Sequence, residues 1–298
     1  MATSSNILKS FGILIKSRVE AIFIWSWLTA ITCLVVGRGF PPLIPTLTTV
    51  FAMVFMSMSM YLFNDVIDAE MDSYNEMKSK RPIPSGKVSK EDTMKLVYIA
   101  GVLGFGLLLS VNLYSFLFGA LYVMTLIGYS HPSIRFKKRF LLNETFYFTC
   151  FLYAGLMASY AVAGVPSLPG LFAAIIFGAF ITTLKPLFGD STDMEEDRQF
   201  GMRHLGVILS WKAKIQMMIL VVLFIMTITP LTYVRLGFNV ILPIFVVATS
   251  LLYLRMMFPI MNNYDKVIVM RAKKFTHVYF FLLQILILVS SLNINLPF

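Results

Sequence analysis

The sequence is divided into apolar runs of the length that a helix needs to cross a membrane. About 17 to 25 predominantly apolar residues span a hydrocarbon core of roughly 30 Å. The first run continues without a small-residue cleavage site, so we interpret it as a retained span and not as a signal peptide. We count nine runs, at residues 19–36, 42–63, 94–110, 113–129, 142–163, 168–188, 213–232, 238–259 and 275–295. The pattern predicts an all-α, polytopic membrane protein with nine transmembrane helices in one bundle.

The composition agrees with a membrane protein, because 58% of the residues are hydrophobic and only 13% are charged, whereas soluble domains have about 25% charged residues. The third and fourth runs are separated by only a few residues after Ser110, which leaves a count of eight spans open. No linker rich in Pro, Gly or Ser divides the chain, so we expect a single domain over residues 1–298. Cys33 and Cys150 lie within predicted spans without metal-ligand spacing, which favours packing roles over a disulfide or a zinc site.

The basic residues, which give the chain its net charge of +10, fall on alternate connections. They precede the first run and follow the second, fourth, sixth and eighth, whereas the opposite connections hold only Arg38 and Arg235. Such a one-sided distribution supports the count of nine. By the positive-inside rule we expect an integral protein of the cell membrane with a cytoplasmic N-terminus and an external C-terminus. The same placement argues against a nucleic-acid partner.

Two polar connections, residues 64–93 and 189–212, begin with the same acidic spacing, Asp-x-x-Asp-x-Glu-x-Asp. Nine of the 15 acidic residues of the chain lie in these two motifs. Residues i, i+3 and i+7 share one face of a helix, so each motif projects three aspartates from one stripe. Solvated helix ends also carry acidic residues, but two motifs with identical spacing on the same side of the membrane favour a chemical role.

Carboxylates stacked at this spacing repel one another, so they need a compensating charge. Mg²⁺ supplies it, because this ion takes oxygen ligands from carboxylates, phosphates and water; Asn64 adds a neutral oxygen one turn from Asp68. The stretch KSKRPIPSG, residues 78–86, places three cations beside a Pro/Gly turn whose backbone N–H groups can face an anion. Carboxylates, Mg²⁺ and basic residues together predict a diphosphate-binding site at the cytoplasmic side.

Three stretches, NDVIDAEMD, RPIPSG and DSTDMEEDRQFG, resemble the UbiA superfamily of intramembrane prenyltransferases, and the resemblance extends over essentially the whole chain. It implies a nine-helix bundle around a central cavity open to the lipid, with cytoplasmic cap loops, two Mg²⁺ ions and a bound isoprenyl diphosphate. The second motif departs from the family pattern at Gly189, at Glu196 and in the stretch 201–206. These departures leave the spacing of its aspartates intact.

The resemblance also implies roles for individual residues, carried over by position. The metal ligands would be Asn64, Asp68, Asp72, Asp190, Asp193 and Asp197. The diphosphate would contact Arg18, Lys80, Arg81, Lys137 and Lys185. Tyr129, Ser130 and Arg135, from the stretch YSHPSIRFKK, would lie near the phosphates or the acceptor. Asp68 would act in catalysis through the metal, and Asp65 or Asp193 would accept a proton from the acceptor. For His131, His204 and His277 we expect loop or interfacial roles.

We therefore expect transfer of an isoprenyl group from an allylic diphosphate to a lipophilic or amphiphilic acceptor in the membrane. The first motif with RPIPSG looks most similar to archaeal-type members that alkylate geranylgeranylglyceryl phosphate in ether-lipid synthesis, and Arg135, Lys137 and Lys138 offer the second basic patch that such an acceptor requires. Aromatic acceptors of quinone, haem or chlorophyll pathways are the alternative. An ion or metal transporter is an alternative of another class, but it predicts ionisable residues near mid-membrane, whereas these acids lie at helix ends.

Overall fold

The computed structural model describes residues 7–76, 78–189, 197–198, 200–262 and 265–292, and within these ranges it holds helices and no strand. Nine helical segments of the described chain are long and apolar enough to cross a membrane, as the sequence predicts. They are α1 (Ile7–Val36), α2 (Leu43–Ser73), α3 (Lys90–Val111), α4 (Leu113–Ser130), α5 (Leu142–Ala163), α6 (Leu168–Leu184, continued by the π-helical η3, Lys185–Gly189), α9 (Trp211–Thr232), α10 (Ile241–Ile260) and α11 (Lys266–Ser291). Short helical turns are η1 (Lys78–Lys80), η2 (Phe136–Lys138) and α8 (Leu205–Ile208).

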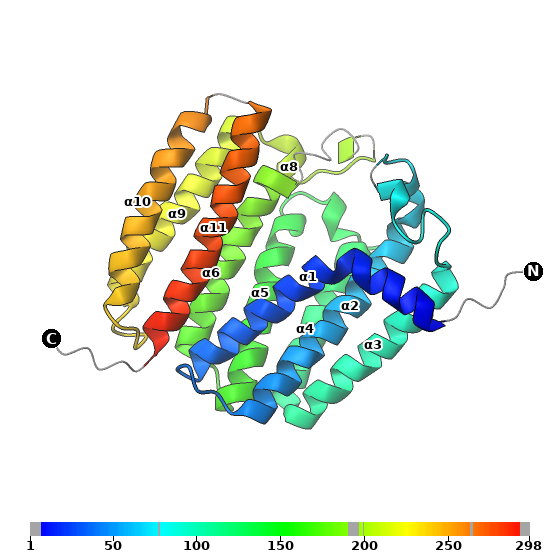
Figure 1. Cartoon of the computed structure of the whole chain (residues 1–298), viewed down its shortest axis with the longest axis horizontal. Helices are drawn as coiled ribbons and strands as arrows, with labels where there is room; N and C mark the ends of the chain where they lie inside the picture. Colours follow the sequence, from blue (N-terminus) through cyan, green and yellow to red (C-terminus); the bar gives the residue numbers. More distant parts are fainter. Residues whose placement is uncertain (1–6, 77, 190–196, 199, 263–264, 293–298) are drawn as a thin grey trace, which may run out of the picture.

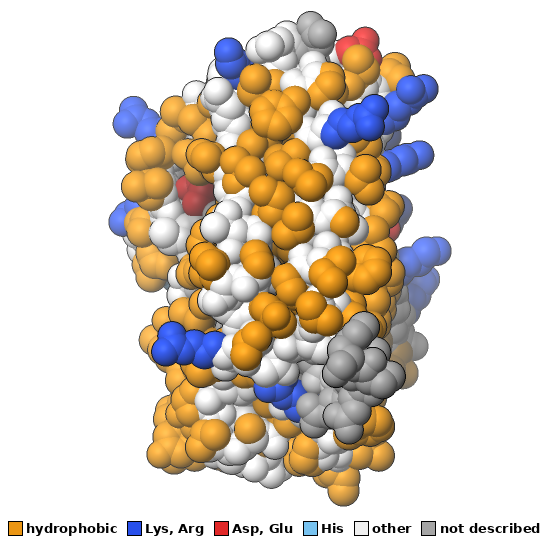
Figure 2. Space-filling view, turned by 90° about the vertical axis from the view of Figure 1, so that its left-hand side faces the viewer, with side chains coloured by type: hydrophobic (Ala, Val, Ile, Leu, Met, Phe, Trp, Pro, Cys, Tyr) orange, Lys and Arg blue, Asp and Glu red, His pale blue; other side chains and the backbone are white. Residues whose placement is uncertain are grey.

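The helices pack side by side, with α1 to α4 on one side of the bundle, α9 to α11 on the other, and α5 and α6 between them (Figure 1). One apolar core joins buried residues of all nine long helices, and a second core fills the space among α1, α2 and α3. The outer surface is also apolar. Figure 2 shows hydrophobic side chains over most of the face on the α10 side, where Phe245, Leu251 and Leu252 are exposed. The protein is therefore an integral membrane protein in which an apolar exterior faces lipid.

A single residue, Asn112, separates α3 from α4 and decides between eight and nine spans. Its backbone is extended, with φ −171° and ψ 165°, so the helix cannot continue through it. Its side-chain oxygen then accepts a hydrogen bond from the backbone N–H of Ser115 at 2.8 Å, which caps the start of α4. Its side-chain amide donates to the carbonyl of Tyr160 at 3.0 Å and ties the turn to α5. The prediction of nine spans is confirmed by this break.

Helix α2 continues about three turns beyond the apolar run that the sequence predicts at residues 42–63, because its acidic motif is also helical. The aspartates of this extension are buried, with 4% exposure for Asp65 and Asp68 and 2% for Asp72. Helices α1 and α11 likewise begin earlier than expected, at Ile7 and Lys266, since charged side chains interrupt hydropathy without interrupting a helix. The acidic motif is thus part of a rigid helix and not a flexible loop.

Candidate active site

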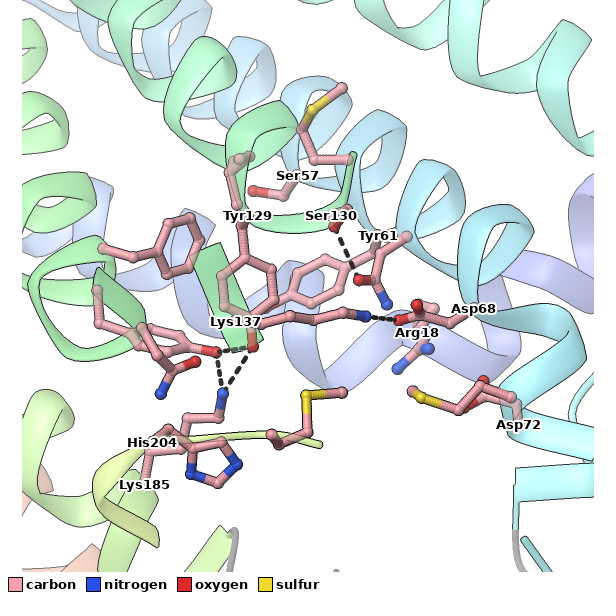
Figure 3. A pocket seen from close by; sticks show the side chains of 18 of the residues that line it. Arg18, Ser57, Tyr61, Asp68, Asp72, Tyr129, Ser130, Lys137, Lys185 and His204 are labelled. Carbon is pink, nitrogen blue, oxygen red and sulfur yellow. Dashed lines mark hydrogen bonds and ion pairs between the residues drawn. The ribbon is translucent and has the colours of Figure 1, made fainter. Parts of the chain in front are cut away.

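A cavity of about 280 Å³ lies where the acidic end of α2 faces α4, α5 and η3 (Figure 3). Side chains of α1 and of the connections that carry η1, η2 and α8 complete its lining. Ten of the residues that the sequence singles out lie on its wall: Arg18, Asn64, Asp68, Asp72, Arg81, Tyr129, Ser130, Lys137, Lys185 and Asp197. Residues from both acidic motifs therefore meet at one cavity. Asp190 and Asp193 of the second motif lie outside the described residues.

Asn64, Asp68 and Asp72 form the acidic wall of the cavity on α2. A residue advances about 100° around an α-helix, so residues four apart drift by only about 40° and form a gently curved stripe. Ser130, the last residue of α4, donates a hydrogen bond to Oδ1 of Asn64 at 2.8 Å. This contact places the Tyr129–Ser130 end of α4 directly against the α2 stripe.

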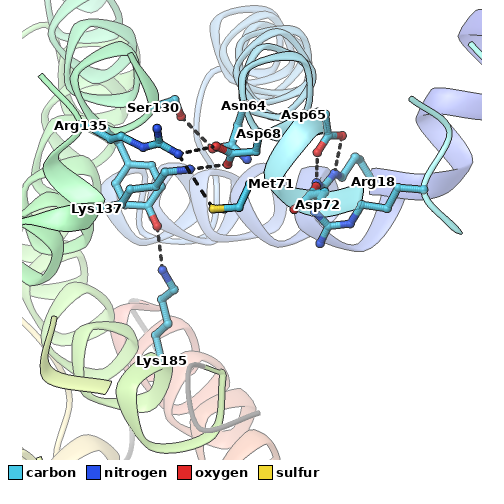
Figure 4. A network of polar contacts seen from close by, with 12 residues as sticks. Arg18, Asn64, Asp65, Asp68, Met71, Asp72, Ser130, Arg135, Lys137 and Lys185 are labelled. Carbon is cyan, nitrogen blue, oxygen red and sulfur yellow. Dashed lines mark hydrogen bonds and ion pairs between the residues drawn. The ribbon is translucent and has the colours of Figure 1, made fainter. Parts of the chain in front are cut away.

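Asp68 is held by two cations from the η2 turn. Lys137 Nζ forms an ion pair with Asp68 Oδ2, and Arg135 Nη2 lies 3.5 Å from Oδ1 (Figure 4). Arg135 is outside the cavity lining and adopts a left-handed backbone conformation, with φ 45° and ψ 60°, which is uncommon for a residue with a side chain. Burial lowers the pKa of the Lys137 ammonium, although the adjacent Asp68 carboxylate acts in the opposite direction.

Asp72 is paired with the connection after α2. Arg81 Nη1 lies 2.6 Å from Asp72 Oδ2, and Lys78 also reaches the cavity. Lys80, on η1, is exposed and is not among the residues that line the cavity. The expectation that backbone N–H groups face an anion is wrong for much of this loop. The N–H groups of residues 81, 85, 86 and 88 donate to carbonyls within residues 78–83, so the loop presents side chains.

Asp65 stands apart from the cavity-lining residues, although it belongs to the same motif. Both of its oxygens accept from Arg18 of α1: Nε donates to Oδ2 at 2.8 Å and Nη2 contacts Oδ1 (Figure 4). The helix geometry accounts for this difference. Asp65 lies at the edge of the stripe and about 10 Å deeper along the helix axis than Asp72, at a level where α1 is its neighbour.

Lys185, in the π-helical turn after α6, lies between two tyrosines. Its Nζ donates to the hydroxyl of Tyr129 at 2.9 Å and to the hydroxyl of Tyr147, and it lies 4.3 Å from the centre of the Tyr147 ring. Phe146 stacks on Tyr129 with a centroid separation of 4.2 Å. Sequence reasoning did not find Tyr147, because an aromatic residue in an apolar span carries no signal of its neighbours.

Two further residues of the wall were not among the predicted site residues. His204 lies in the connection before α8, is buried and lines the cavity, where its Nε2 lies 3.1 Å from Asp197 Oδ2. The expected loop position thus brings this histidine to the cavity wall. Asn143, at the start of α5, also lines the cavity.

The donor set suits Mg²⁺ in its chemistry. Asn64, Asp68, Asp72 and Asp197 present amide and carboxylate oxygens to one cavity, and this hard cation prefers oxygen ligands. Within the described part of the chain, no three His, Cys, Asp or Glu side chains form a ready-made cluster for a metal. The oxygens of Asp68 and Asp72 contact cationic side chains instead, and two of the predicted ligands lie in the segment that is not described.

Comparisons of sequence agree with this architecture. A model of the UbiA prenyltransferase family matches residues 24–285. The chain is 24% identical, over 258 residues, to the digeranylgeranylglyceryl phosphate synthase of Methanocaldococcus jannaschii, and this alignment covers 85% of this chain and 86% of that protein. It is also 24% identical, over 206 residues, to the 4-hydroxybenzoate octaprenyltransferase of Marinomonas sp. (strain MWYL1), and this alignment covers 68% of this chain and 70% of that protein.

Solved structures share the fold. A structure of a digeranylgeranylglyceryl phosphate synthase superposes with a TM-score of 0.76 at 22% identity, covering 97% of this chain and 99% of the other. A UbiA homologue from Archaeoglobus fulgidus bound to GPP and Mg²⁺ superposes with a TM-score of 0.64 at 15% identity, covering 90% of this chain and 98% of the other. The family match extends over most of the chain and includes all the cavity elements except the start of α1, where Arg18 lies. The chain therefore belongs to the UbiA prenyltransferase family of intramembrane enzymes that transfer prenyl groups.

Proposed function

We propose that this prenyltransferase moves a geranylgeranyl group from its allylic diphosphate to geranylgeranylglyceryl phosphate. The whole chain acts as one domain, with the cavity and the N-terminus on the cytoplasmic side of the cell membrane. One observation carries the choice of acceptor: cations lie on both sides of Asp68, with Arg18 on one side and Arg135 and Lys137 on the other (Figure 4). Arg81, which is paired with Asp72, and the cavity-lining Lys78 complete the first group, and Lys185 completes the second.

Two cationic groups suit two anionic substrates. A donor diphosphate requires one group, and an acceptor that carries a phosphate monoester requires another, because a phosphate with nearly two negative charges is recognised by several Lys and Arg side chains. An aromatic carboxylate acceptor carries a single negative charge and needs fewer cations. The relative named as a digeranylgeranylglyceryl phosphate synthase also matches more of this chain than the relative named for 4-hydroxybenzoate. Both facts support the phosphorylated acceptor.

In this proposal the two acidic motifs hold two Mg²⁺ ions. Asn64, Asp68 and Asp72 serve the first ion, and Asp190, Asp193 and Asp197 serve the second. Bound Mg²⁺ supplies positive charge that neutralises the diphosphate oxygens as the leaving group departs. Asp65 has a different role: its two oxygens accept from Arg18, so it holds that guanidinium at the cavity wall. Asp193 remains the predicted acceptor of the proton.

The protein side chains do the remaining work. Arg81 and Lys78 stabilise the negative charge that develops on the departing diphosphate, and Lys137 orients the acceptor phosphate, while Arg135 contacts Asp68 from outside the cavity lining. The faces of Tyr61, Tyr129 and Phe146 on the cavity wall stabilise positive charge on the allylic carbon. The apolar surroundings of the cavity exclude water, which would otherwise capture the cation.

The acceptor is tested by supplying purified protein with Mg²⁺, labelled geranylgeranyl diphosphate and either geranylgeranylglyceryl phosphate or 4-hydroxybenzoate. We expect kcat/KM to be at least about tenfold higher for the phosphorylated acceptor, the effect of one additional charge-assisted contact. Equal or higher kcat/KM with 4-hydroxybenzoate overturns the acceptor. In the same assay Asp68→Ala should abolish turnover and Glu70→Ala, an exposed residue of the same motif, should leave it unchanged. Wild-type turnover in Asp68→Ala overturns the metal assignment.

A further inference from the structure

We infer that Glu144 is a positioning residue, which holds Asp197 of the second acidic motif at the cavity through the backbone of Leu205. The inference rests on the proposed function, because it requires that Asp197 serve the metal. Glu144 itself is outside the cavity lining. It acts on the site through the residues that follow Asp197, and nothing in the sequence pattern of either motif points to it.

The position of Glu144 is unusual for a carboxylate. It lies in the first turn of α5, beside Asn143, and is only 4% exposed. Its Oε1 accepts from the backbone N–H of Leu205 at 2.7 Å and from Asn143 Nδ2 at 3.2 Å. Its Oε2 is buried and has no hydrogen-bond partner within the described residues. A buried carboxylate is costly, so its contact with Leu205 is the feature that accounts for its placement.

The segment that Glu144 holds leads directly to Asp197. Leu205 begins α8, and the side chain of the preceding residue, His204, gives this short helix no cap. His204 instead points at the cavity, with Nε2 3.1 Å from Asp197 Oδ2. A backbone hydrogen bond also connects this stretch to Asp197, because the N–H of Met202 donates to the carbonyl of Asp197 at 2.8 Å. Glu144 therefore fixes Leu205, Leu205 fixes His204, and His204 fixes the carboxylate.

Two backbone N–H groups of the described stretch 200–205 donate to the η2–α5 region, and Glu144 accepts from one of them, at 2.7 Å. The other donor is the N–H of Arg203, which donates to the carbonyl of Lys138 at 3.2 Å. The Glu144 contact is the shorter of the two. Partners that orient a metal-ligating carboxylate change metal affinity by about 10- to 100-fold when they are removed. Loss of Glu144 should therefore loosen Asp197 without removing it.

The test measures Mg²⁺ binding in the absence of turnover. Purified full-length protein is mixed with geranyl diphosphate and no acceptor, and the rise of its unfolding temperature is followed against Mg²⁺ concentration. In Glu144→Ala the Mg²⁺ midpoint should increase about tenfold, read as the rise above the unfolding temperature that the same variant has without Mg²⁺. Glu144→Gln keeps an acceptor oxygen for Leu205 and should restore the wild-type midpoint. Glu91→Ala, which removes an exposed glutamate from the first turn of α3, is the matched control.

Further variants separate the inference from the function on which it rests. Glu144→Asp keeps the charge but is one methylene too short for the 2.7 Å contact, so it should shift the midpoint as Glu144→Ala does, even where the alanine variant does not fold. Asp197→Asn should raise the midpoint more than either. If Asp197→Asn leaves the midpoint unchanged, the assignment of Asp197 to the metal is wrong, and the inference falls with it. If Asp197→Asn raises the midpoint and both Glu144→Ala and Glu144→Asp match the wild type, only the inference is wrong.

Discussion

Replacing Lys137 with Met should move two affinities in opposite directions. Lys137 forms a buried ion pair with Asp68, and the side chains of the two residues are 7% and 6% exposed. A cation at this carboxylate competes with any metal ion that binds the same oxygens. The same ammonium lines the cavity and is available to a phosphate group. Lys137→Met should therefore strengthen the binding of Mg²⁺ alone and weaken the binding of the acceptor phosphate when Mg²⁺ is saturating.

The size of each effect follows from the contact that is removed. A hydrogen bond to a charged group contributes about 1.5–3 kcal/mol, which corresponds to about 10- to 100-fold in affinity. Both partners are buried, so screening by solvent does not reduce this figure as it does for surface pairs. Arg135 still lies 3.5 Å from Asp68 in the variant and retains part of the competition. We therefore expect Mg²⁺ affinity to rise by about tenfold, the lower end of the range.

Isothermal titration calorimetry measures both affinities in detergent-purified protein. Mg²⁺ is titrated first without a substrate, and geranylgeranylglyceryl phosphate is then titrated at saturating Mg²⁺, where its dissociation constant should rise at least about tenfold. Lys138→Met is the control, because this neighbouring lysine lies outside the cavity lining. Mg²⁺ affinity that is unchanged or reduced in Lys137→Met would refute the competition between the ammonium and the metal at Asp68.

Two other predictions follow from the cation positions. Asp65→Asn removes the charged partner of the half-buried Arg18 guanidinium and should lower the free energy of unfolding by about 1–3 kcal/mol; a double-mutant cycle with Arg18→Met should show coupling of about 0.5–3 kcal/mol, whereas additive effects would contradict the pairing. Lys185→Met removes the cation between Tyr129 and Tyr147, and steady-state kinetics should show KM for the phosphorylated acceptor rising about tenfold with a smaller change for the donor. A larger rise of KM for the donor than for the acceptor would instead indicate that Lys185 contacts the diphosphate.

Sequence reasoning predicted the spans because hydropathy over about 20 residues is a local property. It placed the starts of α1 and α11 too late by 12 and 9 residues, since charged residues at the membrane surface end a hydropathy run but not a helix. It left the break between α3 and α4 open. Asn112 ends one helix and caps the next within a single residue, so the break is shorter than the interval that a hydropathy window resolves.

The site shows which information the sequence lacks. The identities and spacing of Asp68 and Asp72 predicted acidic residues on one face, and both line the cavity. The partner of each aspartate depends on which helix or loop lies beside that turn of α2, and this is a property of the folded bundle. Helix periodicity therefore placed Asp65 in one group with Asp68, whereas in the folded bundle Asp65 is paired with Arg18 of the neighbouring helix α1. Glu144 was missed for the same reason, because its contact with Leu205 joins residues 61 positions apart.

The pairing of each first-motif aspartate with a different cation explains how α2 can carry three buried carboxylates. Arg18, Lys137 and Arg81 come from three separate elements, so neutrality is reached only when α1, η2 and the connection after α2 are all in place. At Asp68 and Asp72 the same oxygens are required for a metal, and the same cations are required for phosphates. A metal ion that binds alone takes the carboxylates of these ion pairs, so the cations lose their partners. A diphosphate that binds alone takes the cations, so the carboxylates lose theirs. Each ligand should therefore raise the affinity for the other by an equal factor, as linkage requires. On wild-type protein, calorimetric titration of Mg²⁺ with and without geranyl diphosphate, and of geranyl diphosphate with and without Mg²⁺, measures that factor twice; two unequal factors would contradict the argument.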